Sequence, residues 1–340
     1  MEPLRVAVVG ASGYTGAEFL RLARLHPALR LTRLCAESKA GLPLSEVLPS
    51  FFGADLPPLV RFDATDVAAA ADFAVLGLPH GAAQDAAAEL LEAGVRVVDM
   101  SADHRFTDPD EFARIYGPHR HPANLAETVY GLPELNREAL RTTRLAGCAG
   151  CYPTSVVLAV TPAREAGLLA TDEVIADSKS GVSGAGRTPG AGTHFPETAE
   201  GLHAYKTFDH RHAPEIGRAL GGLKVRFTPH LVPMNRGILS TVYLRVKPET
   251  TLAAVRSIYE RRYADEPFVR VLPAGVHPDT RHVRGSNLCH LGLFLDDDLL
   301  CVQSVIDNLT KGAAGQALQC LNLMAGLPET MGLDHTALFP

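Results

Sequence analysis

The chain has 340 residues, with 32 Lys and Arg against 38 Asp and Glu, which gives a formal net charge of −6 at pH 7. This length is more than one hydrophobic core usually fills, so we expect two domains. A net negative charge does not indicate binding to nucleic acid or to an anionic membrane. No apolar run approaches the roughly 20 residues of a membrane span. The N-terminus has no secretory segment and the six cysteines are unpatterned, which indicates a cytoplasmic protein.

The first predicted element is a buried parallel strand, Val6–Val9, and a helix is expected from Ala17 to His26, ahead of Pro27. A glycine-rich turn separates the two. Strand, turn and helix in this order are the context of a dinucleotide fingerprint, although the spacing is G-x-x-G-x-x-G and not G-x-G-x-x-G. The turn residues are candidate ligands of a cofactor: Gly10, Ser12, Gly13, Tyr14, Thr15 and Gly16.

A second strand is predicted over residues 31–36, and the residues that follow it bear on the choice of cofactor. An acidic residue at this place binds the ribose 2′-OH of NAD, whereas polar and basic groups accept the 2′-phosphate of NADP. Glu37 is followed here by Ser38 and Lys39, so the local signal is mixed.

Two more apolar strands, 73–78 and 95–99, flank a helix predicted over 81–93. Repeated β-α-β units predict a doubly wound parallel sheet. The strands end in the polar turns Pro79-His80-Gly81 and Ser101–Arg105, where a cofactor lies in such sheets. His80 and Asp103 could equally be a helix-start residue and a turn cap. Residues 104–137 show little periodicity and are expected to form a long ordered excursion.

A cysteine turn, Gly147–Ser155, precedes the helix-like run Val156–Val160. A thiol at a helix N-terminus meets the positive end of the dipole, which favours the thiolate, so Cys151 is a candidate nucleophile. Hydroxyls at Thr154 and Ser155 are candidate donors to an oxyanion. Cys148 and Cys151 also form a C-x-x-C, which leaves a redox pair open. The other cysteines stand singly and no second C-x-x-C exists, so no metal site is expected.

The second half of the chain begins with a strand over 173–177 and a Gly/Ser loop, Lys179–Arg187, whose N–H groups and cations suit a phosphate or carboxylate; a merely flexible loop is the alternative. His210-Arg211-His212 lies ahead of Pro214 and offers a proton shuttle, although surface histidines are common.

Strands at 225–232, 239–246, 268–272, 288–295 and 299–305, with a helix after Leu252, predict an α+β second domain. We expect a Rossmann-type domain over 1–150, an α+β domain over 151–306, and a C-terminal helix in 307–340 whose apolar face returns to the first domain.

Together these motifs resemble the N-acetyl-gamma-glutamyl-phosphate reductase family of arginine biosynthesis. The matching stretches run in family order over nearly the whole chain: residues 10–16, 78–81, 101–103, 130–135, 150–154, 179–187, 210–215 and 307–316. The resemblance implies NADPH-dependent reduction of N-acetyl-L-glutamyl 5-phosphate to the 5-semialdehyde through a thioester on Cys151. It also implies a homo-oligomer, either a dimer or a tetramer.

The resemblance assigns roles to further residues. His210 is favoured as the acid/base, and His212 stays open for that role or for holding substrate. The substrate would meet Ser180, Gly181, Ser183, Arg187 and Arg105. NADP(H) would meet the glycine turn together with Ser38, Lys39, Pro79, His80, Ser101, Asn308 and Lys311.

The chain departs from the family's Asn-Pro-Gly-Cys run, because Cys148 and Ala149 occupy its first two positions. A second thiol near Cys151 predicts a reversible disulfide. Three alternatives remain: a lysine-pathway reductase of a carrier-bound aminoadipyl phosphate, aspartate-semialdehyde dehydrogenase, and a thiol-redox or NADP-binding regulatory protein. The stretch Tyr152–Thr154 and the full Lys179–Arg187 loop favour the arginine enzyme.

Overall fold

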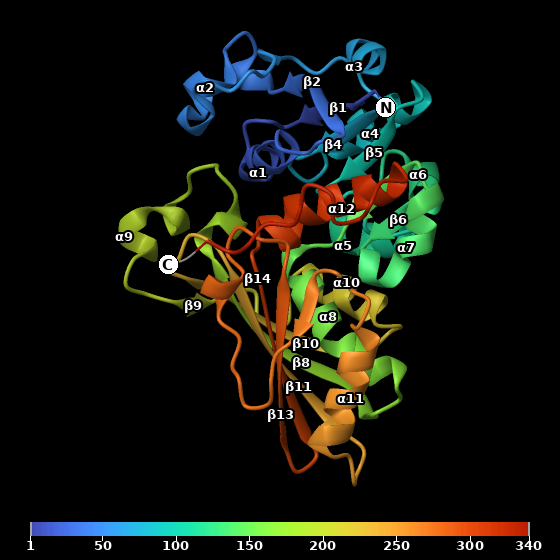
Figure 1. Cartoon of the computed structure of the whole chain (residues 1–340), viewed down its shortest axis with the longest axis vertical. Coiled ribbons are helices and arrows are strands. Elements are labelled where there is room, and N and C mark those ends of the chain that lie inside the picture. The colour runs from blue at the N-terminus through green and yellow to red at the C-terminus, as the bar shows by residue number, and fades with distance from the viewer. Residues whose placement is uncertain (1, 339–340) are drawn as a thin grey trace. The chain divides into compact units, whose positions relative to one another are not determined.

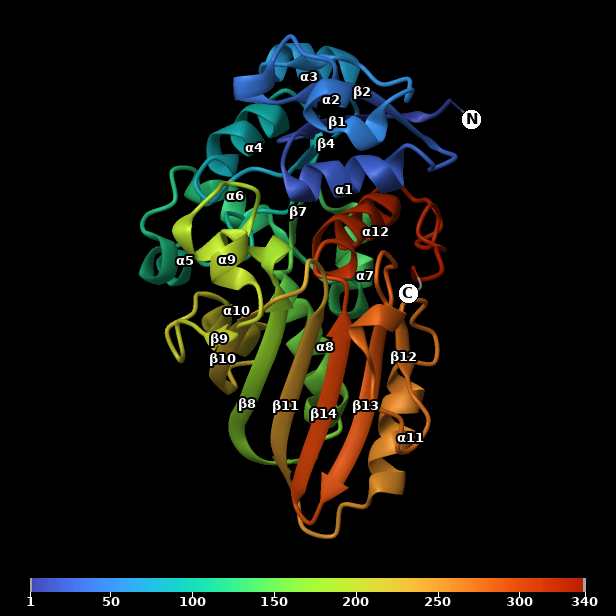
Figure 2. The same ribbon diagram turned by 90° about the vertical axis from the view of Figure 1, so that its left-hand side faces the viewer.

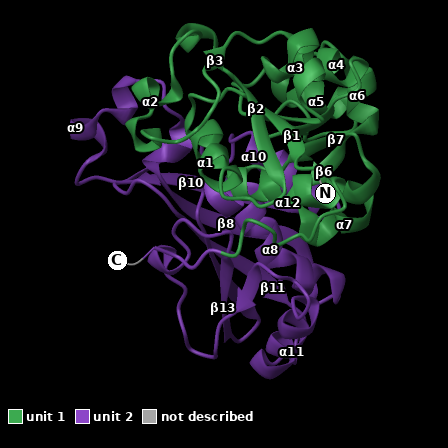
Figure 3. Ribbon diagram, turned by 45° about the horizontal axis from the view of Figure 1, so that its top comes forward, with its two compact units in different colours: residues 1–150, 313–334 green, residues 151–312, 335–340 purple. Residues whose placement is uncertain are grey.

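The computed structural model describes residues 2–338 and divides into two compact units. Unit 1 comprises Met1–Gly150 and Ala313–Asp334, and unit 2 comprises Cys151–Gly312 and His335–Pro340 (Figure 3). The sequence suggested a return to the first domain at residue 307, whereas the structure assigns residues 307–312 to unit 2. Each unit is built around a seven-stranded sheet of its own.

The sheet of unit 1 is wholly parallel. Its strands are β1 (Leu4–Val9), β2 (Leu29–Cys35), β3 (Leu59–Val60), β4 (Phe73–Leu76), β5 (Arg96–Asp99), β6 (Val129–Gly131) and β7 (Leu145–Cys148). Their spatial order is β3-β2-β1-β4-β5-β7-β6, so the winding direction reverses between β1 and β4. The predicted doubly wound parallel sheet is confirmed, and its switch point lies where such sheets bind ligands.

Helices cover both faces of this sheet. They are α1 (Tyr14–Ala23), α2 (Leu44–Val47), α3 (Ala64–Ala70), α4 (Ala83–Glu92), α5 (Pro109–Tyr116), α6 (Pro122–Glu127), α7 (Pro133–Thr142) and α12 (Gly315–Met324). On one face α3 and α4 pack on β1, β4 and β5. On the other, α12 lies between α1 and α7 over β5, β7 and β6 (Figure 1).

Two expectations for unit 1 were wrong in detail. The first helix begins at Tyr14 and ends at Ala23, not at Ala17 and His26, because extended Gly13 starts it and the His26 ring leaves the helix to accept the Ala28 N–H. The excursion over 104–137 contains α5, α6, β6 and the first half of α7; the Asp108 carboxylate caps α5 by accepting two N–H groups. Short helices of this kind give too few turns for a readable period.

The helix α12 was expected to have one apolar face, but every residue of it is buried. Its amides find partners inside unit 1. Gln319 donates to Glu329 at 2.6 Å, and Asn322 donates to the Met331 carbonyl at 2.9 Å and bonds the His26 ring at 3.0 Å. Buried amides are tolerated because these bonds satisfy them.

The sheet of unit 2 is mixed, as an α+β domain requires. Its strands are β8 (Leu169–Gly181), β9 (His203–Ala204), β10 (Lys224–Val232), β11 (Ile238–Val246), β12 (Val269–Val271), β13 (Cys289–Asp296) and β14 (Leu299–Ile306). Their order is β12-β13-β14-β11-β8-β10-β9; β8 pairs with β10 in parallel and with β11 in antiparallel. The predicted α+β class is confirmed.

Within residues 151–312 and 335–338, three helices pack on one face of this second sheet. The helix α8 (Cys151–Glu165) packs on β11 and β14, α10 (His212–Ala219) on β10, and α11 (Leu252–Arg262) on β12 and β13. A short helix, α9 (Phe195–Thr198), precedes β9. Figure 2 shows β8, β11, β14 and β13 facing the viewer with α8 behind them. Among residues 2–338 we find no helix with the length and hydropathy of a membrane span.

Candidate active site

The glycine turn after β1 forms a cradle that only glycine fits. Gly10 has φ +90°, and a Cβ there would lie 2.3 Å from the Gly77 carbonyl oxygen; a Cβ on Gly16 would lie equally close to the Gly10 oxygen. The helix α1 starts after Gly13 with no side-chain cap and no acidic residue in its first turn. Such a helix start attracts an anion such as a pyrophosphate.

The residues after β2 form a short 3₁₀ turn, Glu37–Lys39, and all three are exposed. The Glu37 carboxylate accepts the Phe62 N–H at 3.1 Å. This bond uses one of the two carboxylate oxygens. The contacts expected of Ser38 and Lys39 with a 2′-phosphate stay predictions.

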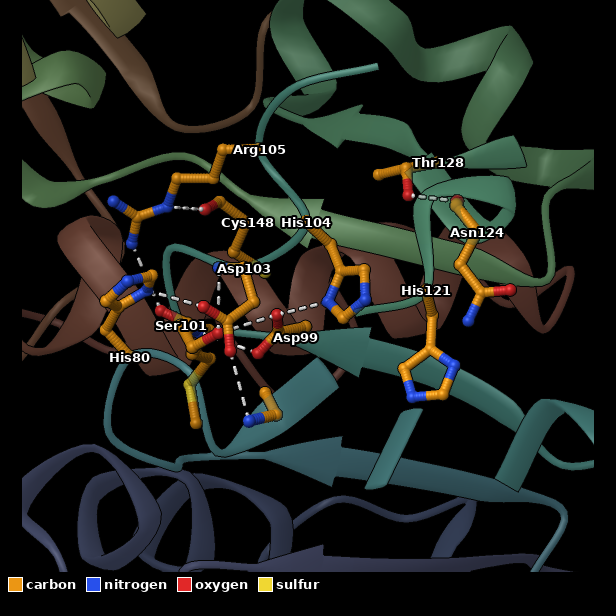
Figure 4. A network of polar contacts seen from close by, with 12 residues as sticks. His80, Asp99, Ser101, Asp103, His104, Arg105, His121, Asn124, Thr128 and Cys148 are labelled. Carbon is orange, nitrogen blue, oxygen red and sulfur yellow. Dashed lines mark hydrogen bonds and ion pairs between the residues drawn. The ribbon is translucent and has the colours of Figure 1, made fainter. Parts of the chain in front are cut away.

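The turns after β4 and β5 are joined by buried carboxylates (Figure 4). Asp103 accepts the N–H groups of Gly81 and Ala83 and lies 2.5 Å from Nδ1 of His80. Ser101 donates its hydroxyl to Asp99 at 2.7 Å, so this candidate cofactor ligand is bound within the turn. Both open alternatives for Asp103 and His80 therefore remain compatible with the geometry, since Asp103 caps the start of α4 and also holds the ring.

Arg105 lies in the same network, but its guanidinium is turned inward. Nε donates to the Cys148 carbonyl at 2.9 Å and Nη2 to the Met100 carbonyl at 3.1 Å, and the residue is 8% exposed (Figure 4). These bonds connect the end of β5 with the end of β7. The substrate contact expected for Arg105 stays a prediction.

Cys151 is the first residue of α8, so the helix begins at the thiol itself and not at the apolar run after it. The thiol is partly exposed, and no acidic residue lies in the first turn. The partial positive charge of the helix start therefore acts on the sulfur without competition from a carboxylate in that turn. Gly312 packs against the cysteine, because a Cβ there would lie 2.9 Å from Cys151 Cβ.

Tyr152 gathers the histidines beside the cysteine. Its ring centroid lies 5.8 Å from that of His210 and 5.9 Å from that of His212, both edge-to-face. Its hydroxyl lies 3.3 Å from the Tyr205 hydroxyl and donates to the His230 carbonyl at 3.1 Å. The sequence analysis did not predict Tyr152 and Tyr205 as site residues, because the sequence does not distinguish them from aromatic residues of the hydrophobic core.

Burial raises the pKa of the Tyr152 and Tyr205 phenols, so both stay protonated donors at neutral pH. Burial, with the nearby charges of Arg211 and Lys206, lowers the pKa of His210 to about 4. His210 Nδ1 accepts the His212 N–H at 3.1 Å. The neutral ring therefore carries its proton on Nε2, which makes it a hydrogen-bond donor at that atom.

The hydroxyl of Ser155 has a structural role in place of the expected role as an oxyanion donor. It donates to the Tyr152 carbonyl at 3.1 Å and lies 2.6 Å from the Ser240 hydroxyl, which lies 2.7 Å from that of Ser178. All three serines are fully buried. This serine chain, Ser178-Ser240-Ser155, connects the sheet of unit 2 to the first turn of α8.

The candidate substrate loop was wrong in its first part, because residues 179–181 continue β8 and only Val182–Ala185 form a turn. Alternation along the strand separates the side chains. Ser180 is buried, whereas Lys179 is half-buried and forms an ion pair with Asp177 at 2.5 Å. Lys179 is therefore a strand residue beside Asp177, and the anion contacts expected of Lys179 and of Arg187, exposed after the turn, stay predictions.

Asn308 connects the turn Val182–Ala185 to the end of β14. Its side chain accepts the Gly237 N–H at 2.7 Å and donates to the Ser183 hydroxyl at 2.9 Å. Gly181 donates to the Gly237 carbonyl, so three loops meet here. Lys311 is fully buried, with Nζ 5.7 Å from the Phe268 ring centroid. The cofactor contacts expected for Asn308 and Lys311 stay predictions.

Comparisons with known proteins decide the family. Residues 5–143 match "Semialdehyde dehydrogenase, NAD binding domain", and residues 151–308 match "Semialdehyde dehydrogenase, dimerisation domain". N-acetyl-gamma-glutamyl-phosphate reductases of Geobacter metallireducens and Rhodospirillum rubrum are 49% and 47% identical to the chain. The matches cover 99% and 100% of the chain and 100% and 99% of the relatives. The chain belongs to the N-acetyl-gamma-glutamyl-phosphate reductase family.

Solved structures support the fold of this reductase family member. Aspartate semialdehyde dehydrogenase II of Vibrio cholerae, complexed with ASA, superposes with TM-score 0.74 at 16% identity, covering 96% of the chain and 99% of that protein. The enzyme of Candida albicans, with NADP, gives TM-score 0.73 at 17% identity over 95% of the chain and 99% of that protein. The predicted resemblance to the reductase family is confirmed, and the aspartate-semialdehyde alternative is left as a likeness of fold.

Proposed function

We propose that the chain reduces N-acetyl-gamma-glutamyl phosphate to N-acetylglutamate semialdehyde with release of phosphate, through a thioester on Cys151. The observation that carries the mechanism is the place of the partly exposed Cys151 as first residue of α8, next in the chain to Tyr152, whose ring contacts His210 and His212. Kinship with the reductases of Geobacter and Rhodospirillum supports the substrate.

The thiolate of Cys151 attacks the acyl carbon, and the carbon–oxygen bond to phosphate breaks. Covalent capture replaces one difficult displacement by two easier steps. The Nε2–H of neutral His210 can donate to the departing phosphate or to the carbonyl oxygen, and His212 lies beside it at a ring separation of 4.7 Å. His210 remains the favoured acid/base, with His212 as the second candidate.

The residues of unit 1 fit a nicotinamide dinucleotide. The glycine cradle at Gly10 and Gly16 leaves no room for a Cβ, and the start of α1 lacks any side-chain cap. When bound there, NADPH would supply the hydride to the thioester carbonyl, and the carbon–sulfur bond would then break to return the Cys151 thiolate and the aldehyde. We propose NADP over NAD because one carboxylate oxygen of Glu37 is bound to the Phe62 backbone, and exposed Ser38 and Lys39 can meet the 2′-phosphate.

The substrate is proposed to lie along Ser180, Gly181, Ser183 and Arg187, where a turn of backbone N–H groups follows the strand and ends at a cation. A carrier-bound substrate would require a basic docking face, which the sequence does not offer. The thiol-redox alternative predicts turnover of disulfides and no phosphate-dependent oxidation of an aldehyde, and the experiment below tests the second of these.

The reverse reaction tests the proposal. Purified protein is mixed with N-acetylglutamate semialdehyde, NADP and inorganic phosphate, and reduced nicotinamide is followed by absorbance. Parallel samples contain aspartate semialdehyde, NAD or Cys151→Ser protein. We expect phosphate-dependent reduction that vanishes with Cys151→Ser and is weaker with NAD. No turnover of this aldehyde by protein that binds NADP would refute the assignment.

We propose in addition that the chain works as a homo-oligomer, a dimer or a tetramer, through the face of the sheet in unit 2 that lies opposite its three helices. Ile175 and Tyr243 are 49% and 36% exposed there. Tyr243 pairs in register with Ile175 of β8 on one side and with Cys301 of β14 on the other. An apolar row of this kind, exposed on a sheet, is typical of an interface. Ile175→Arg is expected to lower the mass measured by light scattering, whereas an unchanged mass would exclude this face. A cytoplasmic location suits the reduced thiol at Cys151.

A further inference from the structure

The turn that follows β4 is held by a residue from another turn. Asp103 lies in the turn after β5 and is fully buried, and its carboxylate receives three donors that all come from residues 80–83. These are the Gly81 N–H at 2.8 Å, the Ala83 N–H at 3.1 Å and the His80 ring. Figure 4 shows Asp103 between His80 on one side and Asp99 and His104 on the other.

Capping α4 does not by itself require this arrangement. Elsewhere in unit 1, Asp63 caps α3 and Asp108 caps α5 from the residue that directly precedes each helix. The residue before α4 is Ala82, which has no capping side chain. The chain uses a carboxylate from 20 residues further on, so Asp103 connects two strand-end turns where a local cap would serve only the helix.

The backbone beneath Asp103 is fixed as well. Its N–H donates to the Ser101 hydroxyl oxygen at 3.0 Å, and Ser101 in turn donates to Asp99, which is fully buried and bonds the His104 ring at 2.7 Å. On the far side of the turn, the Arg120 guanidinium donates to the Gly81 carbonyl. The Gly81 peptide is thus held at its N–H and at its oxygen.

His80 is the side chain that this support orients. Its Nδ1 is bound to Asp103, and its ring packs on Tyr116 with centroids 4.5 Å apart. The side chain is 29% exposed, and in the described part of the chain no second hydrogen-bond partner of the ring is found. With Nδ1–H donated to a carboxylate, Nε2 of the neutral ring is an acceptor.

We infer that Asp103 is a positioning residue, which orients His80 so that Nε2 accepts a hydrogen bond from a donor group of the bound dinucleotide, such as a ribose hydroxyl. The inference rests on the proposed use of NADP(H) by unit 1. The turn lies at the carboxyl end of β4, beside the switch point, and Gly77 at the end of that strand contacts Gly10 of the glycine cradle.

Direct binding tests this inference without turnover. The dissociation constant of NADPH is measured from its fluorescence, and the thermal unfolding of the cofactor-free protein is measured beside it. His80→Asn keeps a donor near Nδ1 and removes Nε2, and Asp103→Asn removes the charge that holds the ring. The matched control is Asp63→Asn, which alters the capping aspartate of another helix of unit 1, α3.

We expect Asp103→Asn and His80→Asn each to weaken NADPH binding about tenfold, the worth of one charge-assisted or ligand hydrogen bond. The double variant should bind hardly less tightly than either single variant, because both changes remove one contact. His80→Asn should leave thermal unfolding unchanged, and Asp63→Asn should leave NADPH binding unchanged.

Two results would overturn the role of Asp103. One is an Asp103→Asn protein that unfolds at lower temperature but binds NADPH as the parent does, which would show a structural cap. The other is full additivity of the two losses in the double variant. Parent protein that binds no NADPH would overturn the proposed function itself, so the two failures are distinguishable.

Discussion

The serine chain of unit 2 makes a quantitative prediction. Ser240→Ala removes the hydroxyl that lies 2.6 Å from Ser155 and 2.7 Å from Ser178, all within a fully buried site. Two hydrogen bonds are lost, and each contributes about 0.5–1.5 kcal/mol net. We therefore expect α8 to open more easily by about 1–3 kcal/mol.

Hydrogen exchange of peptides that cover residues 151–165 measures this opening. A loss of about 1–3 kcal/mol corresponds to exchange roughly 5- to 150-fold faster in the amides of α8. Because Ser155 also donates to the Tyr152 carbonyl, the first turn should be affected with the rest. The rate of Cys151 alkylation by iodoacetamide reports the same turn at the thiol.

Ser304→Ala is the matched control. Ser304 pairs with Ser240 in the neighbouring strand and is equally buried, but among residues 2–338 its hydroxyl has one side-chain contact, with Cys289 Sγ at 3.5 Å. This variant should change the exchange of α8 by a factor of less than about five. Equal acceleration in both variants would refute the reasoning, since it would show that removing any hydroxyl from this row loosens the packing.

Three further predictions concern the site. Gly312→Ala places a Cβ 2.9 Å from Cys151 Cβ, so kcat should fall about 10- to 100-fold, whereas Gly192→Ala, with open space around it, should keep full activity; equal activities would contradict the packing. The pKa of His210 is lowered from 6.5 to about 4, so the unfolded chain binds a proton that the folded one rejects, and stability should fall as pH drops through this window. Urea unfolding of His210→Asn should show a shallower fall; an unchanged slope would exclude this cause. Oxidation by diamide should inactivate the parent and dithiothreitol should restore it, and if Cys148→Ala behaves identically, a Cys148–Cys151 disulfide is excluded.

The fold class could be predicted from the sequence because the buried strands and helices show clear hydrophobic patterns. Val6–Val9 lies inside β1 and is wholly apolar and buried, whereas the run 225–232 lies inside β10, where buried Phe227 and Pro229 alternate with less buried residues. The predicted ends of helices and strands were wrong where no change in the local hydrophobic pattern marks them. The thiol of Cys151 proved to be the first helical residue, and Lys179 belongs to a strand, because neither feature changes the local hydrophobic pattern.

The site could be predicted only at residues whose type and local motif suggest a catalytic or cofactor-binding role. Cys151, His210 and the glycine turn have types that suggest reactions, and the structure brings His210 and His212 to the Tyr152 ring beside the cysteine. Ser240 was missed, and Asp103 was predicted only as a turn residue at the cofactor edge of the sheet, because their roles depend on tertiary contacts. Only the pairing of distant strands and turns shows which groups they hold.

The position of the buried helix α12 near the C-terminus affects the order in which the two units can fold during synthesis. Unit 1 needs residues 313–334, whereas most of unit 2 lies in the uninterrupted stretch 151–312. During synthesis, therefore, the first 150 residues leave the ribosome long before the segment that fills the groove between α1 and α7, and the middle of the chain can mature earlier than its beginning. A nascent chain stopped before α12 should expose the face of the parallel sheet that this helix covers, which makes that stage the one most in need of a chaperone.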